Sequence, residues 1–240
     1  MLRGVNFLNT RAKKGFMNDK IIPALSFVAV IMLFNQVLIT EIQAKVGVPA
    51  GTATAEAPPE LSVDVASLSS TAQTVAAVFP ELKNAKTEED VMRIMLPSGT
   101  PEYSKKLGGI SFSNVEASLN YLAAWYPKIK EEVKKDPELW NRYMNLATRP
   151  LGISCEFCCG VGPQGVDSSG NLRCGCKHNP ALHALVLGLI KYTNYSDAQI
   201  LREAMKWKTA FYPKNMIAIG LQVAGKGSSA ANLPSMVGGC

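Results

Sequence analysis

Apolar residues recur at helical spacing through most of the chain between residues 63 and 224. One stripe runs Val115, Leu119, Leu122 and Tyr126, with the three- and four-residue steps of a half-buried helix. Later stripes comprise Leu182, Leu185, Val186, Leu189 and Ile190, and then Ile200, Ala204, Trp207 and Phe211. No alternating run is long enough to require a sheet. The pattern predicts an all-α protein whose small helical domain spans residues 63–224, with the Trp and Met side chains of the stripes in its core.

Capping residues mark where several of these helices begin. A helix start typically carries Ser, Thr, Asp or Asn at the N-cap, with an acid or amide three residues on or a Pro at the first helical position. Such starts are Thr87, Ser113 with Glu116, Asp136-Pro137, Asn179-Pro180 and Ser196 with Gln199. Pro127 falls inside the stripe that begins at Val115, so we expect it to break or kink that helix.

The segment 148–183 departs from this pattern, because no helical period runs through most of it and Gly, Pro, Ser and Asp are frequent. It holds five of the six cysteines and both histidines in the order C-x2-C-C-x14-C-x-C-x-H-x4-H. A connection of this length without its own structure is unusual in a compact domain, so something is expected to cross-link it. We expect an irregular Cys-rich loop packed against the helices that start near Asp136 and Asn179.

The spacing of the cysteines predicts a metal site. A C-x2-C turn and a C-x-C pair on an extended segment each bring two thiolates together, and the Gly-rich stretch between them allows the pairs to face each other. The expected ligands are Cys155, Cys158, Cys174 and Cys176, with Cys159, His178 and His183 as additional or alternative ligands. Zinc is the default ion for a closed Cys/His site, and an iron–sulfur cluster or copper(I) is the alternative.

Disulfide bonding is the main competing interpretation, since a secreted cysteine cluster can be oxidised. Five clustered cysteines cannot all pair among themselves, and disulfides leave the adjacent histidines unexplained. A redox-thiol interpretation rests on Cys155-Glu156-Phe157-Cys158 alone and lacks the βαβ context of a thioredoxin-like motif. Glu156 could serve as a general base beside a metal, but we expect an exposed side chain.

A single long apolar stretch, residues 21–40, predicts a membrane anchor or the apolar region of a signal peptide. Five basic residues precede it, which favours a cytoplasmic segment 1–20 and a single-pass protein of the cell membrane whose later residues lie outside the cytoplasm. Residues 41–62 are rich in Ala, Pro and Thr and are typical of a linker. Residues 225–240 are expected to form a flexible tail that ends in Cys240.

Composition and charge argue against several classes of function. The net charge is +6, but the first 40 residues carry five Lys and Arg against one Asp, so the rest is nearly neutral and no nucleic-acid partner is expected. No nucleophile elbow, phosphate loop or paired-carboxylate motif is readable, which leans against an enzyme. The membrane is the one partner that the sequence indicates, and no protein partner is identifiable.

The segments C-E-F-C-C-G, C-G-C-K-H-N-P-A and W-K-T-A-F-Y-P resemble an uncharacterised prokaryotic family of membrane-anchored Cys-rich proteins. The C-G-C with its following His is more loosely similar to exported proteins with a PCYCGC motif. The resemblance covers roughly residues 98–215 and implies no established activity. The sequence therefore predicts a membrane-anchored extracytoplasmic protein that binds a metal or an iron–sulfur cluster, for electron transfer, metal handling or as an accessory subunit. The alternative is a disulfide-stapled interaction domain with no metal.

Overall fold

The computed structural model describes residues 58–227 and 232–239, all within the part of the chain from Ala53 to Cys240. These residues form helices and turns, and their only β-type pairings are two isolated bridges, Ile153 with Gln164 and Val166 with Leu172. The predicted all-α class is confirmed for this part of the chain. None of the helices in these two ranges has the length and apolar character needed to cross a bilayer. The predicted membrane segment, residues 21–40, lies outside the described residues.

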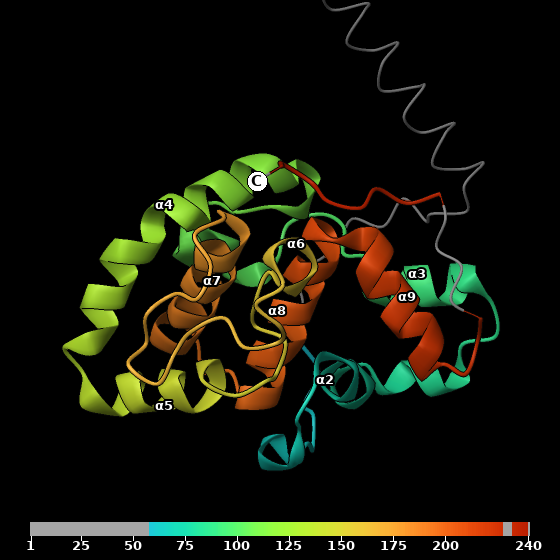
Figure 1. The fold of residues 1–240 in the computed structure, drawn as a ribbon, viewed down its shortest axis with the longest axis horizontal. Helices are drawn as coiled ribbons and strands as arrows, with labels where there is room; N and C mark the ends of the chain where they lie inside the picture. The colour runs from blue at the N-terminus through green and yellow to red at the C-terminus, as the bar shows by residue number, and fades with distance from the viewer. Residues whose placement is uncertain (1–57, 228–231, 240) are drawn as a thin grey trace, which may run out of the picture. The chain divides into compact units, whose positions relative to one another are not determined.

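The helices form a row of neighbours, with α4 (Val115–Lys134) at one side and α9 (Pro213–Val223) at the other (Figure 1). Between them, α7 (His178–Tyr192) packs along α4, and α8 (Asp197–Phe211) packs on both α7 and α9. The other elements are α2 (Thr71–Val78), α3 (Glu88–Met95), α5 (Pro137–Ala147), the single turn α6 (Glu156–Cys159) and the 3-10 turns η1 (Val65–Ser67), η2 (Pro80–Asn84), η3 (Glu102–Leu107) and η4 (Phe112–Asn114).

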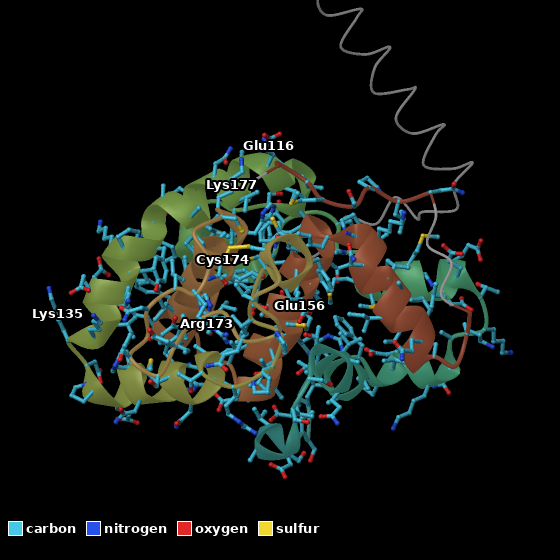
Figure 2. The ribbon with its side chains drawn as sticks, viewed as in Figure 1. Glu116, Lys135, Glu156, Arg173, Cys174 and Lys177 are labelled. Atoms are coloured by element: carbon cyan, nitrogen blue, oxygen red, sulfur yellow. A yellow bond between two sulfur atoms is a disulfide. The ribbon has the colours of Figure 1, made fainter. Side chains whose placement is uncertain are left out.

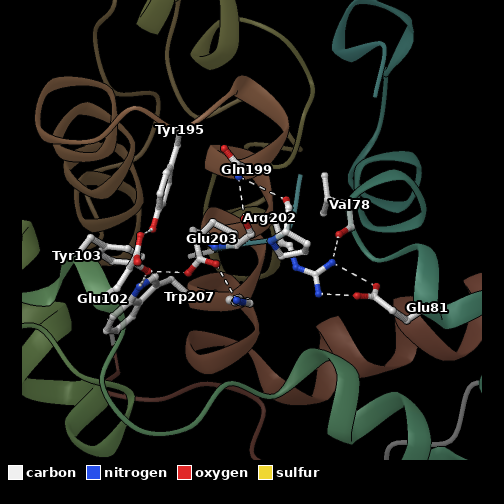
Figure 3. A network of polar contacts seen from close by, with 12 residues as sticks. Val78, Glu81, Glu102, Tyr103, Tyr195, Gln199, Arg202, Glu203 and Trp207 are labelled. Carbon is white, nitrogen blue, oxygen red and sulfur yellow. Dashed lines mark hydrogen bonds and ion pairs between the residues drawn. The ribbon is translucent and has the colours of Figure 1, made fainter. Parts of the chain in front are cut away.

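Helix α8 is central, and buried polar contacts tie it to the elements around it (Figure 3). The indole Nε1 of Trp207 donates to Tyr103 Oη at 2.9 Å, and Tyr103 Oη donates to Glu203 Oε2 at 2.8 Å. On the opposite side, Arg202 donates to Glu81 Oε1 at 2.8 Å. Because buried polar groups are costly without partners, these pairings fix the position of η3 and η2 against α8.

Three of the five predicted helix starts are confirmed, and the one at Ser113 is wrong because Asn114 is the N-cap of α4. Thr87 and Ser196 form capping boxes, and the Asp136 side chain accepts from the first backbone amides of α5. The predicted start at Asn179 is wrong, because α7 begins at His178 without a side-chain cap. Asn179 is buried and instead donates from Nδ2 to the carbonyl oxygen of Gly165 at 2.9 Å, so its side chain holds the Cys-rich loop.

The expected break at Pro127 is also wrong, because α4 is continuous from Val115 to Lys134. Its buried face carries Leu122, Tyr126, Ile129 and Val133 and packs along α7. Burial of apolar area on both sides of the proline stabilises the helix by more than the ~3 kcal/mol that an interior proline costs.

The Cys-rich loop is anchored along its length. Its apolar residues Leu151, Ile153 and Val166 are buried in the core. The backbone amide of Gly152 donates to the carbonyl of Pro163 at 2.9 Å, and that of Arg173 donates to Gly165 at 2.9 Å. These contacts turn the loop back on itself, so residues 155–159 and 174–176 come together although 15 positions separate Cys159 from Cys174.

Residues 232–239, part of the segment predicted to be a flexible tail, contact the domain. The Val237 amide donates to the carbonyl of Phe211 at 2.9 Å, and the Lys214 amide donates to Pro234 at 3.1 Å. In Figure 1 this segment runs from the α9 side toward α4. It therefore covers the junction where α7 begins and α8 ends.

Candidate metal centre

Four cysteine sulfurs meet at one point of the domain. The Sγ atoms of Cys155, Cys159, Cys174 and Cys176 all lie within 4.8 Å of one another. Figure 2 shows the sulfur pair beside Cys174, close to the start of α7 and to Lys177. The segments 155–159 and 174–176 thus each contribute two sulfurs, as the sequence predicts, but the pair from the first segment differs from the expected one.

The first segment forms a turn of helix and contributes Cys159 in place of Cys158. Cys155 is the N-cap of α6, and its sulfur lies 3.4 Å from that of Cys159, four residues later. Residues i+3 and i+4 are both neighbours of residue i on a helix, and here it is the i+4 residue, Cys159, whose sulfur lies beside that of Cys155. Cys158 is exposed and its sulfur is outside the four-sulfur group. Gly160, at φ +67°, ends the turn in the left-handed region.

The second segment carries Cys174 and Cys176 on either side of Gly175, and both are partly buried. The amide of Cys176 lies 3.5 Å from the Cys174 sulfur. A disulfide joins Cys159 to Cys174, while Cys155 and Cys176 are thiols. The four sulfurs therefore consist of one disulfide and one dithiol pair, and all four can bind a metal only when the disulfide is reduced.

The two histidines lie near this region but outside the sulfur group. His183 is fully buried, and its Nδ1 lies 3.0 Å from Tyr143 Oη. Its Nε2 faces the backbone of Gly165, where a Cβ would approach to 2.3 Å. His178 is also buried, and its Nε2 lies 2.8 Å from the carbonyl oxygen of Val237. Both rings are therefore engaged with the loop and with residues 232–239, and their predicted role as ligands stays a prediction.

A buried ion pair holds the cysteine turn. Lys208 of α8 is fully buried and donates from Nζ to Glu156 Oε1 at 2.7 Å and to the carbonyl oxygen of Gly152 at 2.8 Å. Thr71 of α2 donates to the same Glu156 oxygen at 2.7 Å. The expectation that Glu156 is exposed is wrong, since only 12% of its side chain is accessible. A carboxylate so occupied fixes α6 against α8 and α2.

Tyr212 connects the sulfurs to the end of α8. Its ring contacts Phe157 of α6 edge-on, with centroids 5.5 Å apart, and lies 4.8 Å from the ring of His178. The hydroxyl is buried, and the side chain nearest to it that could accept a hydrogen bond is that of Cys176. Burial, and then the nearby Cys176 and Cys155 sulfurs, raise the pKa of Tyr212. The hydroxyl is thus a donor that lies close to the sulfur group.

Burial also governs the protonation of Cys155. It raises the pKa of this thiol to about 12, and the hydrogen bond to Cys176 contributes in the same direction. Without a metal, Cys155 is therefore a neutral thiol at neutral pH. A metal ion would displace the proton, because the thiolate is the ligand form.

The residues fit a metal ion as far as donor chemistry and spacing are concerned. Sulfur ligands of one tetrahedral ion with bonds of about 2.3 Å stand roughly 3.8 Å apart, which lies within the 4.8 Å limit. Lys208 and Tyr212 were not singled out as site residues by the sequence. Both lie in the segment Trp207–Pro213, which is one of the three segments that carry the family resemblance, but the resemblance implied no role for them.

No protein-family profile, curated protein or solved structure matches this chain. The resemblance to membrane-anchored Cys-rich proteins stays a prediction. Function therefore rests on the geometry of the sulfur group.

Proposed function

We propose that this protein is a membrane-anchored, extracytoplasmic metal-binding protein that holds one metal ion through Cys155, Cys159, Cys174 and Cys176. The observation that carries the proposal is the meeting of these four sulfurs within 4.8 Å of one another. Four thiolates are the ligand set of closed zinc sites, so zinc is the ion proposed for the reduced protein.

The spacing favours a single ion over an iron–sulfur cluster. In a [2Fe–2S] cluster, two thiolates belong to each iron, so the two pairs stand farther apart than the ligands of one ion. Here the sulfurs of one segment lie within 4.8 Å of those of the other, and the same bound holds for the two sulfurs inside each segment. A mononuclear site is therefore the better fit, and electron transfer through a cluster is the weaker of the proposed uses.

Exposure favours metal handling over a purely structural role. Cys159 is exposed and Cys176 is partly exposed, whereas Cys155 is buried. A ligand set open on one side allows an incoming thiol or chelator to exchange the ion. The loop also buries Leu151, Ile153 and Val166 in the core, so apolar packing contributes to its position beside the sulfurs.

The cellular setting is proposed from the sequence. The apolar residues 21–40 with five preceding basic residues would anchor the chain and export the domain. A reporter fused after Cys240 should then be active outside the cytoplasm. Activity confined to the cytoplasm would contradict this part of the proposal.

A second candidate is a disulfide-stapled interaction domain without metal, which the Cys159–Cys174 disulfide favours. The two candidates differ in what reduction does. Reduction creates the binding site in the first, and in the second it only removes a cross-link from the loop.

The test uses the full-length chain in detergent, reduced with dithiothreitol, desalted without oxygen and mixed with zinc. We expect one bound zinc per chain in the reduced protein and none in the unreduced protein. Cys155→Ser, Cys159→Ser, Cys174→Ser and Cys176→Ser should each lower zinc affinity strongly.

The control is the double variant Cys158→Ser/Cys240→Ser, which removes the two cysteines outside the four-sulfur set, of which Cys158 is disulfide-bonded in the unreduced protein. It should keep wild-type zinc binding. Equal zinc binding by Cys159→Ser and wild type, or no zinc in the reduced wild type, would overturn the proposed function in favour of the stapled domain.

A further inference from the structure

The disulfide leaves a pair of thiols inside the sulfur group. Cys155 and Cys176 are thiols while Cys159 and Cys174 are bonded to each other. The Cys155 and Cys176 sulfurs also lie within 4.8 Å of one another, close enough for both to contact one ion. The unreduced protein therefore has two sulfur ligands at hand, where the reduced protein has four.

A two-sulfur site suits a different class of ion. Soft monovalent ions such as copper(I) prefer thiolates and accept low coordination numbers, whereas zinc in proteins takes four ligands. An ion held between two sulfurs sets them apart by up to twice the metal–sulfur bond, roughly 4.6 Å for bonds near 2.3 Å. The sulfurs of Cys155 and Cys176 lie within 4.8 Å of one another, which is compatible with this arrangement.

The net charge of the metal–thiolate centre also favours a monovalent ion for the two-sulfur site. Two thiolates with one monovalent ion carry a net charge of −1, whereas four thiolates with one divalent ion carry −2. The buried cation that acts on Cys155 is Lys208, and its charge is already offset by Glu156. A buried centre with the smaller net charge loses less solvation free energy.

A buried donor is also available to one of the two sulfurs. Tyr212 is 1% exposed, its hydroxyl is buried, and it interacts electrostatically with Cys176 and Cys155. The hydroxyl can donate a hydrogen bond to the sulfur of Cys176, and this bond is stronger when the sulfur is a metal-bound thiolate than when it is a thiol. Tyr212 would therefore stabilise negative charge on this pair.

We infer that the disulfide form of the protein binds one soft monovalent ion of the copper(I) class between Cys155 and Cys176. The redox state of Cys159 and Cys174 then selects the metal, with copper(I) for the disulfide and a divalent ion for the four thiols. This inference deepens the proposed function and rests on it for the reduced state only. Conversion between the states takes two electrons and two protons from a dithiol reductant, which is itself oxidised to a disulfide.

The test titrates full-length, unreduced protein in detergent with copper(I) supplied as its acetonitrile complex, without oxygen and in competition with bicinchoninate. We expect one copper(I) per chain, and thiol labelling followed by peptide mapping should find Cys155 and Cys176 as free thiols before metal is added. Cys176→Ser carries the main test, because its partly exposed position tolerates the change better than that of the buried Cys155. It should abolish stoichiometric binding, and Cys155→Ser should do the same.

The double variant Cys158→Ser/Cys240→Ser is the control and should bind copper(I) like wild type. Wild-type copper(I) binding by Cys176→Ser, or a Cys155–Cys176 disulfide found by peptide mapping of the native protein, would overturn the inference. The zinc titration of reduced protein tests the proposed function separately. Loss of zinc binding with copper(I) binding intact would remove the four-sulfur site and leave the two-sulfur site standing.

Discussion

Lys208 Nζ lies 2.7 Å from Glu156 Oε1, and this pair joins the last turn of α8 to the turn that carries Cys155 and Cys159. Burial lowers the pKa of Lys208, and Glu156 acts against that effect. The lysine also donates to the carbonyl oxygen of Gly152, at the entry to the Cys-rich loop. One buried side chain thus holds both the loop and the cysteine turn.

Replacement of Lys208 should therefore destabilise the protein strongly. Lys208→Met leaves the partly buried Glu156 carboxylate without its cation, which typically costs about 3–5 kcal/mol. The measurement is urea unfolding of the full-length chain followed by circular dichroism. The double variant Glu156→Gln/Lys208→Met should recover part of the loss, because no unpaired charge remains.

A surface pair provides the control for Lys208. Lys134 pairs with Glu131 at 3.3 Å, and the Glu131 side chain is 69% exposed. Lys134→Met should change the free energy of unfolding by less than about 1 kcal/mol. A similar loss for Lys208→Met and Lys134→Met would show that the buried pair does not hold the turn.

Acidification should weaken the fold through His183. Burial, and to a lesser extent the positive charge of Lys130, lower the pKa of His183 from 6.5 to about 3. Its ring also faces Tyr143 and Tyr126, which stay neutral in this range. The unfolded chain then binds one more proton than the folded chain between these two pKa values, so stability falls as the pH drops below 6.5. The contribution is about 3 kcal/mol between pH 6.5 and pH 4.

The comparison for this pH effect is His183→Gln, which keeps a polar group beside Tyr143 Oη. Urea unfolding at several pH values should give the variant a shallower fall in stability than wild type over the same range. Carboxylates titrate in both proteins, so the difference between the two slopes isolates the histidine. Parallel slopes would mean that His183 is not held neutral by its surroundings.

Local chemistry predicted the helices well and the tertiary pairings poorly. Thr87, Asp136 and Ser196 cap helices through hydrogen bonds that span only two or three residues, so the sequence alone contains both partners. The Lys208–Glu156 contact spans 52 residues, and neither residue signals the other in the sequence. Interactions of that kind depend on how the helices pack.

The prediction of the metal site likewise succeeded where it depended on the local sequence and failed where it depended on the backbone conformation. The clustering of cysteines identified the right two segments, and Cys174 with Cys176 behaves as the spacing predicts. The choice between Cys158 and Cys159 was not readable from the spacing, because both residues are neighbours of Cys155 on a helical turn. Asn179 failed as a cap because α7 begins one residue earlier, at His178, and the Asn179 side chain donates to the Gly165 carbonyl instead.

Substitution of Gly152 should destabilise the protein for two separable reasons. Its φ of +87° is unfavourable for other residues, and a Cβ there would approach Thr71 Oγ1 to 2.7 Å. Gly109 has nearly the same φ, +85°, but no atom within 4 Å of an added Cβ. Gly109→Ala should cost about 1–2 kcal/mol from backbone conformation alone. Gly152→Ala should cost roughly 1–3 kcal/mol more, from the clash with Thr71.

Thermal unfolding of both glycine variants measures this difference. The clash also disturbs the hydrogen bond from Thr71 to Glu156, so the Gly152 variant should bind metal less well than the Gly109 variant. Equal melting temperatures for the two variants would mean that Thr71 moves aside without loss.

Tyr212→Phe should weaken metal binding while leaving the fold nearly unchanged. The change removes only the hydroxyl, whose nearest acceptor is the weakly accepting sulfur of Cys176, so little stability is lost. A bound thiolate at Cys176 would lose a donor, and loss of such outer contacts typically lowers metal affinity about 10–100-fold.

The matched control is Tyr126→Phe, since the Tyr126 hydroxyl is also buried but lies beside His183. Competition titrations with zinc for reduced protein and copper(I) for unreduced protein should give lower affinity for Tyr212→Phe and wild-type affinity for Tyr126→Phe. Unchanged affinity in both titrations would mean that the Tyr212 hydroxyl packs near the sulfurs without donating to them.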